Sequence, residues 1–373
     1  MSSTTWRALV VSALLALSGG ALVACGDDDG GGDAGGSGDG GGGSGSIAFL
    51  LPESKTARYE SQDRPNFERR LGELCPDCEL IYSNADQDAA KQQQQAEAAI
   101  TKGAEVLVLD PVDAASAGSI VARAKQSYIP VISYDRLITD ADVDYYISFD
   151  NERVGQLQGE SLVEKLDQDG DGSGTIVMIN GAPTDNNAKL FKQGAHSVID
   201  ESDLKVGREY DTPDWSPDRA QQQMEQAITA LGQGGFVGVY AANDGTAGGA
   251  IAAMKSAGID PSTRPTTGQD AELAAIQRIL TGEQYMTVYK AIKPEAEAAA
   301  ELAVALVRGE DPPAGLVEDE VDNGQKQVPS VLLTPVAVTR DNIQDTIVKD
   351  RFWTVDQICT ARYRQACEEA GIR

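Results

Sequence analysis

Residues 104–136 read A-E-V-L-V-L-D-P-V-D-A-A-S-A-G-S-I-V-A-R-A-K-Q-S-Y-I-P-V-I-S-Y-D-R, with two short apolar runs on either side of a longer stretch. The runs at 106–109 and 130–133 have the length and composition of buried strands, and 114–126 is typical of a helix. A strand, a helix and a second strand in this order predict a right-handed crossover between parallel strands.

The same alternation continues on both sides of this unit and restarts after residue 150. The sequence therefore predicts an α/β fold of two successive units with parallel sheets, rather than one continuous sheet. Further strands are predicted at 47–51, 79–82, 175–180, 204–210, 238–241, 266–269, 286–289 and 331–333, and further helices at 65–74, 88–102, 151–167, 187–199, 217–231, 245–257, 270–281 and 294–308.

Composition narrows the class of partner. The chain has 373 residues, 41% of them hydrophobic, which suits one large or two ordinary domains with real cores. Its formal net charge of −27 repels nucleic acid and anionic lipid head groups, so neither is expected as a partner. No long apolar run follows the N-terminal one, so the mature chain is not expected to span a membrane.

The N-terminus has the pattern of an export signal. An apolar run at 8–17, with Arg7 ahead of it, leads to L-V-A-C at 22–25 and then to glycine, serine and aspartate up to residue 46. This predicts a signal peptide over 1–25 ending in a bacterial lipobox, a lipid on Cys25 and a flexible tether over 26–46. The protein would then be held at the outer face of the cytoplasmic membrane. The alternative is an ordinary signal peptide with an incidental cysteine.

Four further cysteines are Cys75, Cys78, Cys359 and Cys367. An even number in an oxidising compartment predicts structural disulfides. A zinc site would need all four thiolates, because His196 is the single histidine. A redox C-x-x-C pair is expected at a helix N-terminus after a buried strand, whereas C-P-D-C falls between a helix and a strand. Two local disulfides are therefore favoured.

Polar, charged and aromatic residues follow seven of the predicted strands, where ligands bind in open α/β sheets. Carboxylates accept hydrogen bonds from sugar hydroxyls, cations and amides donate to them, and aromatic rings cover the apolar face of a sugar. For the Asp and Asn members, helix capping is the alternative role. The candidate ligand-binding residues are Arg58, Tyr59, Asp135, Arg136, Asp185, Asn187, Trp215, Asn243, Asp270 and Lys290.

Long motifs in the chain resemble the xylose-binding proteins of bacterial ABC transporters. The stretches are 134–155, D-N-N-A-K-L-F at 185–191, N-D-G-T-A-G-G-A-I at 243–251, G-Q-D-A-E-L at 268–273, M-T-V-Y-K at 286–290 and V-P-S-V-L-L-T-P at 328–335. The resemblance covers nearly everything from 47 to 351. It implies a type I periplasmic binding protein: two Rossmann-like lobes joined by a three-strand hinge, with a sugar bound between them.

The resemblance also implies domain bounds, partners and roles. The first lobe would comprise 47–151 and 291–327, and the second 152–290 and 328–373. The ten candidate residues match the sugar-contacting positions of the family, except that the family usually has tryptophan where this chain has Tyr59, which affects selectivity among sugars. A monomer that delivers xylose or a related aldose to the membrane subunits of an ABC permease is implied, with no cofactor.

Other chemistry is less well supported by the sequence. Asp167, Asp169 and Asp171 imitate the start of a calcium loop, but its twelfth position would be Met178, so no metal site is predicted. A dinucleotide loop and a G-x-S-x-G nucleophile motif are missing, and His196 falls within a helix, away from any strand end. An enzyme is therefore disfavoured. A sensor that presents the closed form to a membrane receptor stays open as an alternative.

Overall fold

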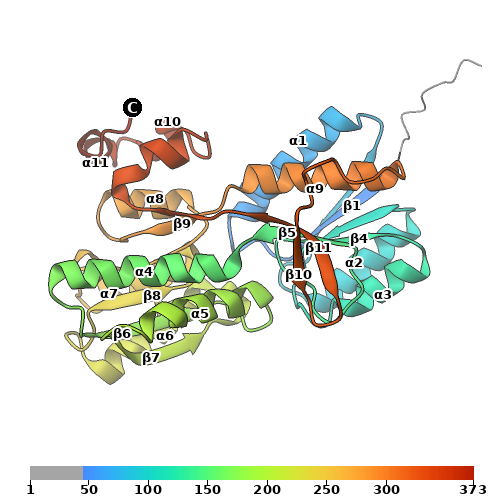
Figure 1. Cartoon of the computed structure of the whole chain (residues 1–373). Coiled ribbons are helices and arrows are strands. Elements are labelled where there is room, and N and C mark those ends of the chain that lie inside the picture. Colours follow the sequence, from blue (N-terminus) through green and yellow to red (C-terminus); the bar gives the residue numbers. More distant parts are fainter. Residues whose placement is uncertain (1–44) are drawn as a thin grey trace, which may run out of the picture. The chain divides into compact units, whose positions relative to one another are not determined.

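The computed structural model describes residues 45–373, whose helices and strands form two α/β lobes (Figure 1). The predicted signal peptide, the lipidation site Cys25 and nearly all of the predicted tether lie outside the described residues. Among the helices of residues 45–373, none is long and apolar enough to cross a membrane.

The first lobe contains a seven-stranded sheet in the order β10-β11-β5-β4-β3-β1-β2. All neighbours are parallel except β10 and β11, which are antiparallel. The carboxyl ends of the parallel strands therefore meet at one end of the sheet. The strands are β1 (Ser46–Leu51), β2 (Glu79–Asn84), β3 (Val106–Leu109), β4 (Val131–Tyr134), β5 (Tyr145–Phe149), β10 (Asp319–Asp322) and β11 (Gln327–Leu333).

Four helices cover this sheet: α1 (Arg64–Leu74), α2 (Ala89–Thr101), α3 (Gly118–Gln126) and α9 (Ile292–Val307). Successive side chains of a strand point to opposite faces, so both faces of a buried strand need a partner. In β1, Ile47 and Phe49 pack in one cluster with α1 and α9, whereas Ala48 and Leu50 pack in another with α2 and α3. Figure 1 shows α1 and α9 together on one side of the sheet.

The second lobe contains a parallel three-stranded sheet, β7-β6-β8, and an antiparallel pair, β12 and β9. Its strands are β6 (Thr175–Asn180), β7 (Lys205–Asp211), β8 (Gly238–Ala241), β9 (Thr287–Tyr289) and β12 (Val336–Val338). Its helices are α4 (Asn151–Asp169), α5 (Asn186–Ile199), α6 (Pro217–Leu231), α7 (Asp244–Ser256) and α8 (Leu273–Leu280).

Two glycines let α4 and α5 approach each other closely. A Cβ atom on Gly155 would lie 1.9 Å from the carbonyl oxygen of Phe191, and one on Gly194 would lie 2.0 Å from that of Glu152. These distances are far below van der Waals contact, so only glycine fits at either position. The site residue Asn187, in the first turn of α5, is thereby fixed relative to α4.

The chain passes between the lobes three times, from β5 to α4, from β9 to α9 and from β11 to β12. Strand pairing places β11 in the first sheet, since Ser330 pairs with Tyr146 and Leu333 with Phe149. The resemblance implied a second lobe that includes 328–373, whereas this pairing places the last crossing after Leu333.

Most predicted elements are present, with three differences. The helix expected at 270–281 begins only at Leu273, because Asp270 and Ala271 have φ of 90° and 48° and end any helical path. The strand expected at 266–269 is reduced to two isolated bridges, from Thr266 to Val239 and from Gln269 to Val288. Strands β5, β10 and β12 were not predicted as such.

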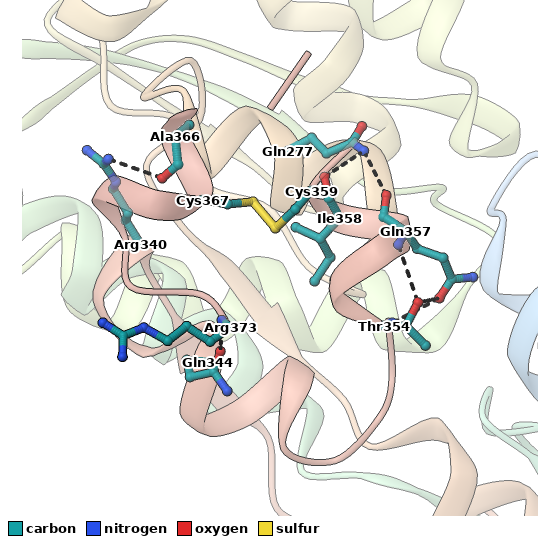
Figure 2. Close-up of a disulfide and its surroundings, with 10 residues drawn as sticks. All are labelled: Gln277, Arg340, Gln344, Thr354, Gln357, Ile358, Cys359, Ala366, Cys367 and Arg373. Atoms are coloured by element: carbon teal, nitrogen blue, oxygen red, sulfur yellow. Dashed lines mark hydrogen bonds between the residues drawn. A yellow bond between two sulfur atoms is a disulfide. The ribbon is translucent and has the colours of Figure 1, made fainter. Parts of the chain in front are cut away.

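After β12 the chain forms short turns and the helices α10 (Val355–Ile358) and α11 (Arg364–Glu369), which pack on the second lobe. The structure joins Cys359 to Cys367 with an S–S distance of 2.05 Å (Figure 2) and Cys75 to Cys78 with 1.98 Å. Cys75–Cys78 closes the turn between α1 and β2, and Cys359–Cys367 ties α10 to α11.

Candidate ligand-binding site

A small, mostly polar cavity lies between the two lobes, at the ends of the strands. All ten residues predicted from the sequence line this cavity, and the structure adds Thr56, Phe191 and Gln269. Phe191 was within reach of sequence reasoning, because it lies four residues after Asn187 and therefore on the same face of α5. Gln269 directly precedes Asp270, whereas nothing in the sequence singles out Thr56.

Three of the lining residues have a backbone conformation that side chains rarely adopt. Asp135, Trp215 and Asp270 have φ values of 53°, 51° and 90°. Such conformations cost on the order of 1–3 kcal/mol each and are found where a surrounding structure enforces them, often at ligand sites. Asp135 directly follows β4, Trp215 ends the short turn Pro213–Trp215 after β7, and Asp270 directly follows the bridge residue Gln269, and all three side chains line the cavity.

Two cations and two carboxylates meet at the centre of the site. Arg58 Nη1 and Lys290 Nζ lie 3.2 and 3.3 Å from Asp135 Oδ1, and Lys290 Nζ lies 3.5 Å from Asp270 Oδ1. Burial alone would raise the pKa of Asp135, but the charges of Arg58 and Lys290 outweigh it and hold that pKa well below its ordinary value. Asp135 is therefore ionised and accepts hydrogen bonds.

Arg58 is held from behind by a second set of buried groups. Its Nε and Nη2 donate to the two oxygens of Asp63 at 3.0 and 2.6 Å, and Nη2 also donates to Glu295 Oε2 at 2.7 Å. Tyr134 Oη donates to Asp63 Oδ1 at 2.6 Å. The guanidinium is thus fixed by partners that do not line the cavity, while Nη1 faces the ligand side.

Arg136 has a similar but looser set of acidic neighbours. Its Nε lies 3.0 Å from Asp185 Oδ2 and 3.6 Å from Asp110 Oδ1, and its Nη2 lies 3.7 Å from Glu53 Oε1. Asp185 in turn accepts hydrogen bonds from the Trp215 indole at 3.1 Å and from the Asn187 amide at 2.8 Å. Asp185 therefore links the cap of α5, the tryptophan and the arginine.

Aromatic rings form two walls of the cavity. Tyr59 lies between the guanidinium groups of Arg58 and Arg136, at 5.3 and 5.6 Å from its ring centre, and its hydroxyl donates to Asp135 Oδ2 at 3.2 Å. Trp215 packs edge-on against Phe191, with ring centres 6.3 Å apart. Rings of this kind stack on apolar C–H faces of a ligand.

Asn243 caps a helix and lines the cavity at once. Its Oδ1 accepts from the Thr246 amide at 2.8 Å in a capping box at the start of α7. Its Nδ2 has no hydrogen-bond partner within residues 45–373 and can donate to a ligand. The capping role proposed from the sequence and the ligand-facing position are therefore compatible.

Some buried acceptors of the site lack a hydrogen-bond donor among the described residues, although Asp270 Oδ1 lies within ion-pair distance of Lys290. Asp270 Oδ1 and Gln269 Oε1 are buried and accept no hydrogen bond there. Unsatisfied buried acceptors are costly, which points to donors supplied by a ligand. The lining contains three cations and three carboxylates, so the ligand need carry no net charge. Within residues 45–373, His, Cys, Asp and Glu form no cluster suited to a metal ion.

Sequence comparison assigns the fold to a family. The profile of the periplasmic binding protein domain matches residues 47–311. The chain belongs to the type I periplasmic binding proteins. The D-xylose-binding periplasmic protein of Escherichia coli is 40% identical to this binding protein over 310 residues, covering 82% of this chain and 90% of the relative. The Haemophilus influenzae protein of the same name is 41% identical over 283 residues, covering 75% and 82%.

Two further relatives extend the comparison. The multiple sugar-binding periplasmic receptor ChvE of Rhizobium radiobacter is 34% identical over 330 residues, covering 84% of this binding protein and 92% of the relative. An ABC transporter solute-binding protein from Clostridium phytofermentans, solved with bound β-D-glucose, has a TM-score of 0.76 and 31% identity. It covers 84% of this chain and 99% of its own.

Proposed function

We propose that this protein binds D-xylose or a closely related aldose between its lobes and delivers it to an ABC permease. The observation that carries the proposal is the cavity lining, in which three cations, three carboxylates and two aromatic walls surround a small space. A neutral polyol with an apolar face satisfies such a lining, because its hydroxyls donate to Asp135 and Asp270 and accept from the cations. The D-xylose-binding relatives support the choice of sugar.

The proposed mechanism is closure of the two lobes on the sugar. Arg58, Tyr59, Asp135 and Arg136 follow strands of the first lobe, whereas the other six proposed ligands follow strands of the second. A sugar that bonds to both sets stabilises the closed form relative to the open form by its differential affinity. The permease would then recognise the closed form.

A sensor is the second candidate function. It is favoured by the similarity to the protein named a multiple sugar-binding receptor. A permease and a receptor would both recognise the closed form, so the residues of the cavity do not show which of the two is the partner. The genes beside this one and pull-down of the full-length protein with membrane partners would distinguish the two. An enzyme is the remaining alternative, and product analysis after long incubation with D-xylose tests it.

Export and lipid anchoring complete the proposal. The L-V-A-C sequence at 22–25 and the glycine-rich stretch after it support a lipid on Cys25 and a tethered, extracytoplasmic binding protein. The two cysteine pairs support an oxidising compartment. Cys25→Ser should release an intact binding protein into the medium, and retention of that variant in the membrane fraction would contradict the anchor.

Titration calorimetry across pentoses and hexoses tests the proposal. D-Xylose should bind most tightly, and Asp270→Ala and Arg136→Ala should lose binding while they keep the far-ultraviolet circular dichroism spectrum of the wild type. Matched controls are Glu310→Ala and Arg219→Ala, which remove exposed charges away from the cavity. Unchanged affinity in either cavity variant would contradict the site, and heat from none of the sugars would contradict the function.

A further inference from the structure

The C-terminal cap, defined as residues 352–373, packs against the same part of the second lobe that carries Asp270 and Lys290. Its side chains Phe352, Ile358 and Cys367 share one hydrophobic cluster with Ala271 and Tyr289. Figure 2 shows the cap with its disulfide and with Gln277 of α8, whose amide donates to the carbonyls of Gln357 and Ile358. The cap therefore contacts residues next to the proposed site.

The turn that carries Asp270 is strained and is held by four hydrogen bonds. The amides of Asp270, Ala271 and Glu272 donate to Val288 O, Thr287 Oγ1 and Asp244 Oδ2 at 2.9, 3.2 and 2.9 Å. The fourth bond comes from the cap, where the Trp353 indole N–H donates to Ala271 O at 2.8 Å. With φ of 90° and 48° at successive non-glycine residues, this turn persists only because its surroundings enforce it.

Phe352, the neighbour of Trp353, extends these contacts to the rest of the site. Its ring packs edge-on against Tyr289, which precedes Lys290, with centres 5.1 Å apart. Its carbonyl accepts a hydrogen bond from Gln62 Nε2 at 3.3 Å, and Gln62 belongs to the first lobe, in the turn that begins at Tyr59. The start of the cap thus contacts Ala271, Tyr289 and Gln62, which lie one to three residues from Asp270, Lys290 and Tyr59.

We infer that Trp353 is a positioning residue for sugar binding, which acts by holding the Asp270–Ala271 turn so that Asp270 Oδ1 faces the ligand. This inference rests on the proposed function, since it adds a residue outside the cavity to that site. Trp353 suits the role because its ring is anchored against Phe352, with centres 5.5 Å apart, and its single N–H reaches the turn. Phenylalanine keeps the packing and removes the donor.

The first arm of the test measures affinity by titration calorimetry with D-xylose and its monodeoxy analogues. Trp353→Phe should weaken D-xylose binding about tenfold, which corresponds to about 1.4 kcal/mol. In the wild type, each monodeoxy analogue should bind more weakly than D-xylose. In Trp353→Phe, this loss of affinity should become smaller for the analogue that lacks the hydroxyl bonded to Asp270 and should stay the same for the other analogues. Gln277→Ala is the matched control, because it removes cap contacts that do not involve the turn. It should bind every sugar as the wild type does.

The second arm measures hydrogen exchange of the sugar-free protein in a peptide covering 268–276. Trp353→Phe should speed exchange of the Ala271 and Glu272 amides, whereas Gln277→Ala should not. Should Trp353→Phe fail to fold, site-specific replacement of Trp353 by benzothienylalanine removes only the N–H and keeps the ring shape.

Wild-type exchange in the turn, or an equal loss of affinity for every sugar, would overturn the positioning role. A wild-type protein that binds no monosaccharide would overturn the proposed function instead, and the exchange arm would still decide whether Trp353 holds the turn.

Discussion

The two walls of the cavity reach their geometry by different means. The first-lobe wall is fixed by charge, since Arg58 is held by Asp63 and Glu295 and Arg136 lies near Glu53 and Asp110. The second-lobe wall is fixed by backbone, through the caps Asp185 and Asn243 and the strained positions of Trp215 and Asp270. Losing a partner should therefore leave a buried charge in the first wall and a relaxed loop in the second.

Removing the main partner of Arg58 should have the largest effect. Asp63→Ala leaves the buried guanidinium without an acceptor for Nε, while Nη2 keeps Glu295, and breaking a buried ion pair in this way costs roughly 3–5 kcal/mol. Urea unfolding of the sugar-free protein measures the change. The control is Glu68→Ala, which breaks an exposed pair with Arg64 and should cost less than about 1 kcal/mol. Similar losses in both variants would show that the first wall does not depend on buried charge.

The second wall should respond to pH. Burial raises the pKa of Glu272 to about 8 from an ordinary 4.5, and the neighbouring Asp244, whose own pKa burial raises to about 7, adds to the shift. The folded state thus retains a proton that the unfolded state has lost, and stability falls as pH rises between these values, by at most about 1.4 kcal/mol per pH unit. Glu272→Gln removes the contribution of Glu272 to this fall in stability. In urea unfolding, the free energy of unfolding of the variant minus that of the wild type should therefore increase from pH 5 to pH 8.

The exposed Glu225→Gln is the control for this pH experiment and should track the wild type at every pH. If Glu272→Gln also ran parallel to the wild type, the proton would not reside on Glu272 in the folded protein.

Asn243 allows the two roles of a single side chain to be separated. Asn243→Ala should lower the free energy of unfolding by about 1 kcal/mol through loss of the α7 cap and should also weaken sugar binding. Asn243→Asp keeps the capping oxygen but removes the amide donor, so it should restore stability and not affinity. Thermal unfolding and calorimetry report the two quantities. If Asn243→Asp restored both the stability and the sugar affinity, helix capping would be the single role of Asn243.

The smallest effect is expected at Tyr59. Tyr59→Phe removes one donor to Asp135, which keeps Arg58 and Lys290, so the loss of stability should be about 0.5–1.5 kcal/mol. The freed oxygen of Asp135 becomes available to a ligand, and the order of affinities among pentoses and hexoses should change. An unchanged order across a calorimetric sugar panel would remove Tyr59 from the determinants of selectivity.

The sequence predicts the residues that line the cavity better than the buried residues that hold them in place. The ten candidate residues all follow strands, and strands of four to six apolar residues are local patterns. Asp63 and Glu295 were not predicted, because Glu295 meets Arg58 across a separation of 237 residues and its position in α9 looks like an ordinary helical glutamate. Contacts of this kind depend on tertiary packing, which a local pattern does not encode.

The missed strand β5 and the late start of α8 have different causes. β5 follows β4 without an intervening helix, so the alternation that reveals the other parallel strands is interrupted there. The start of α8 is displaced by two positive φ values that hydrogen bonds from β9, α7 and Trp353 enforce. At α8, therefore, partners distant in sequence override a local preference, whereas β5 was missed because no helix separates it from β4.

The junction of β5 and α4 has a mechanical consequence. β5 ends at Phe149 and α4 begins at Asn151, so Asp150 alone separates the first sheet from a helix of 19 residues. Such a helix is about 28 Å long, and a rotation of about 10° about one end displaces the other by about 5 Å. Asn151, at the start of the helix, donates to Asn187 Oδ1 at 3.0 Å. A rotation about this end would therefore move Asn151 little and Asp169, at the far end of α4, most.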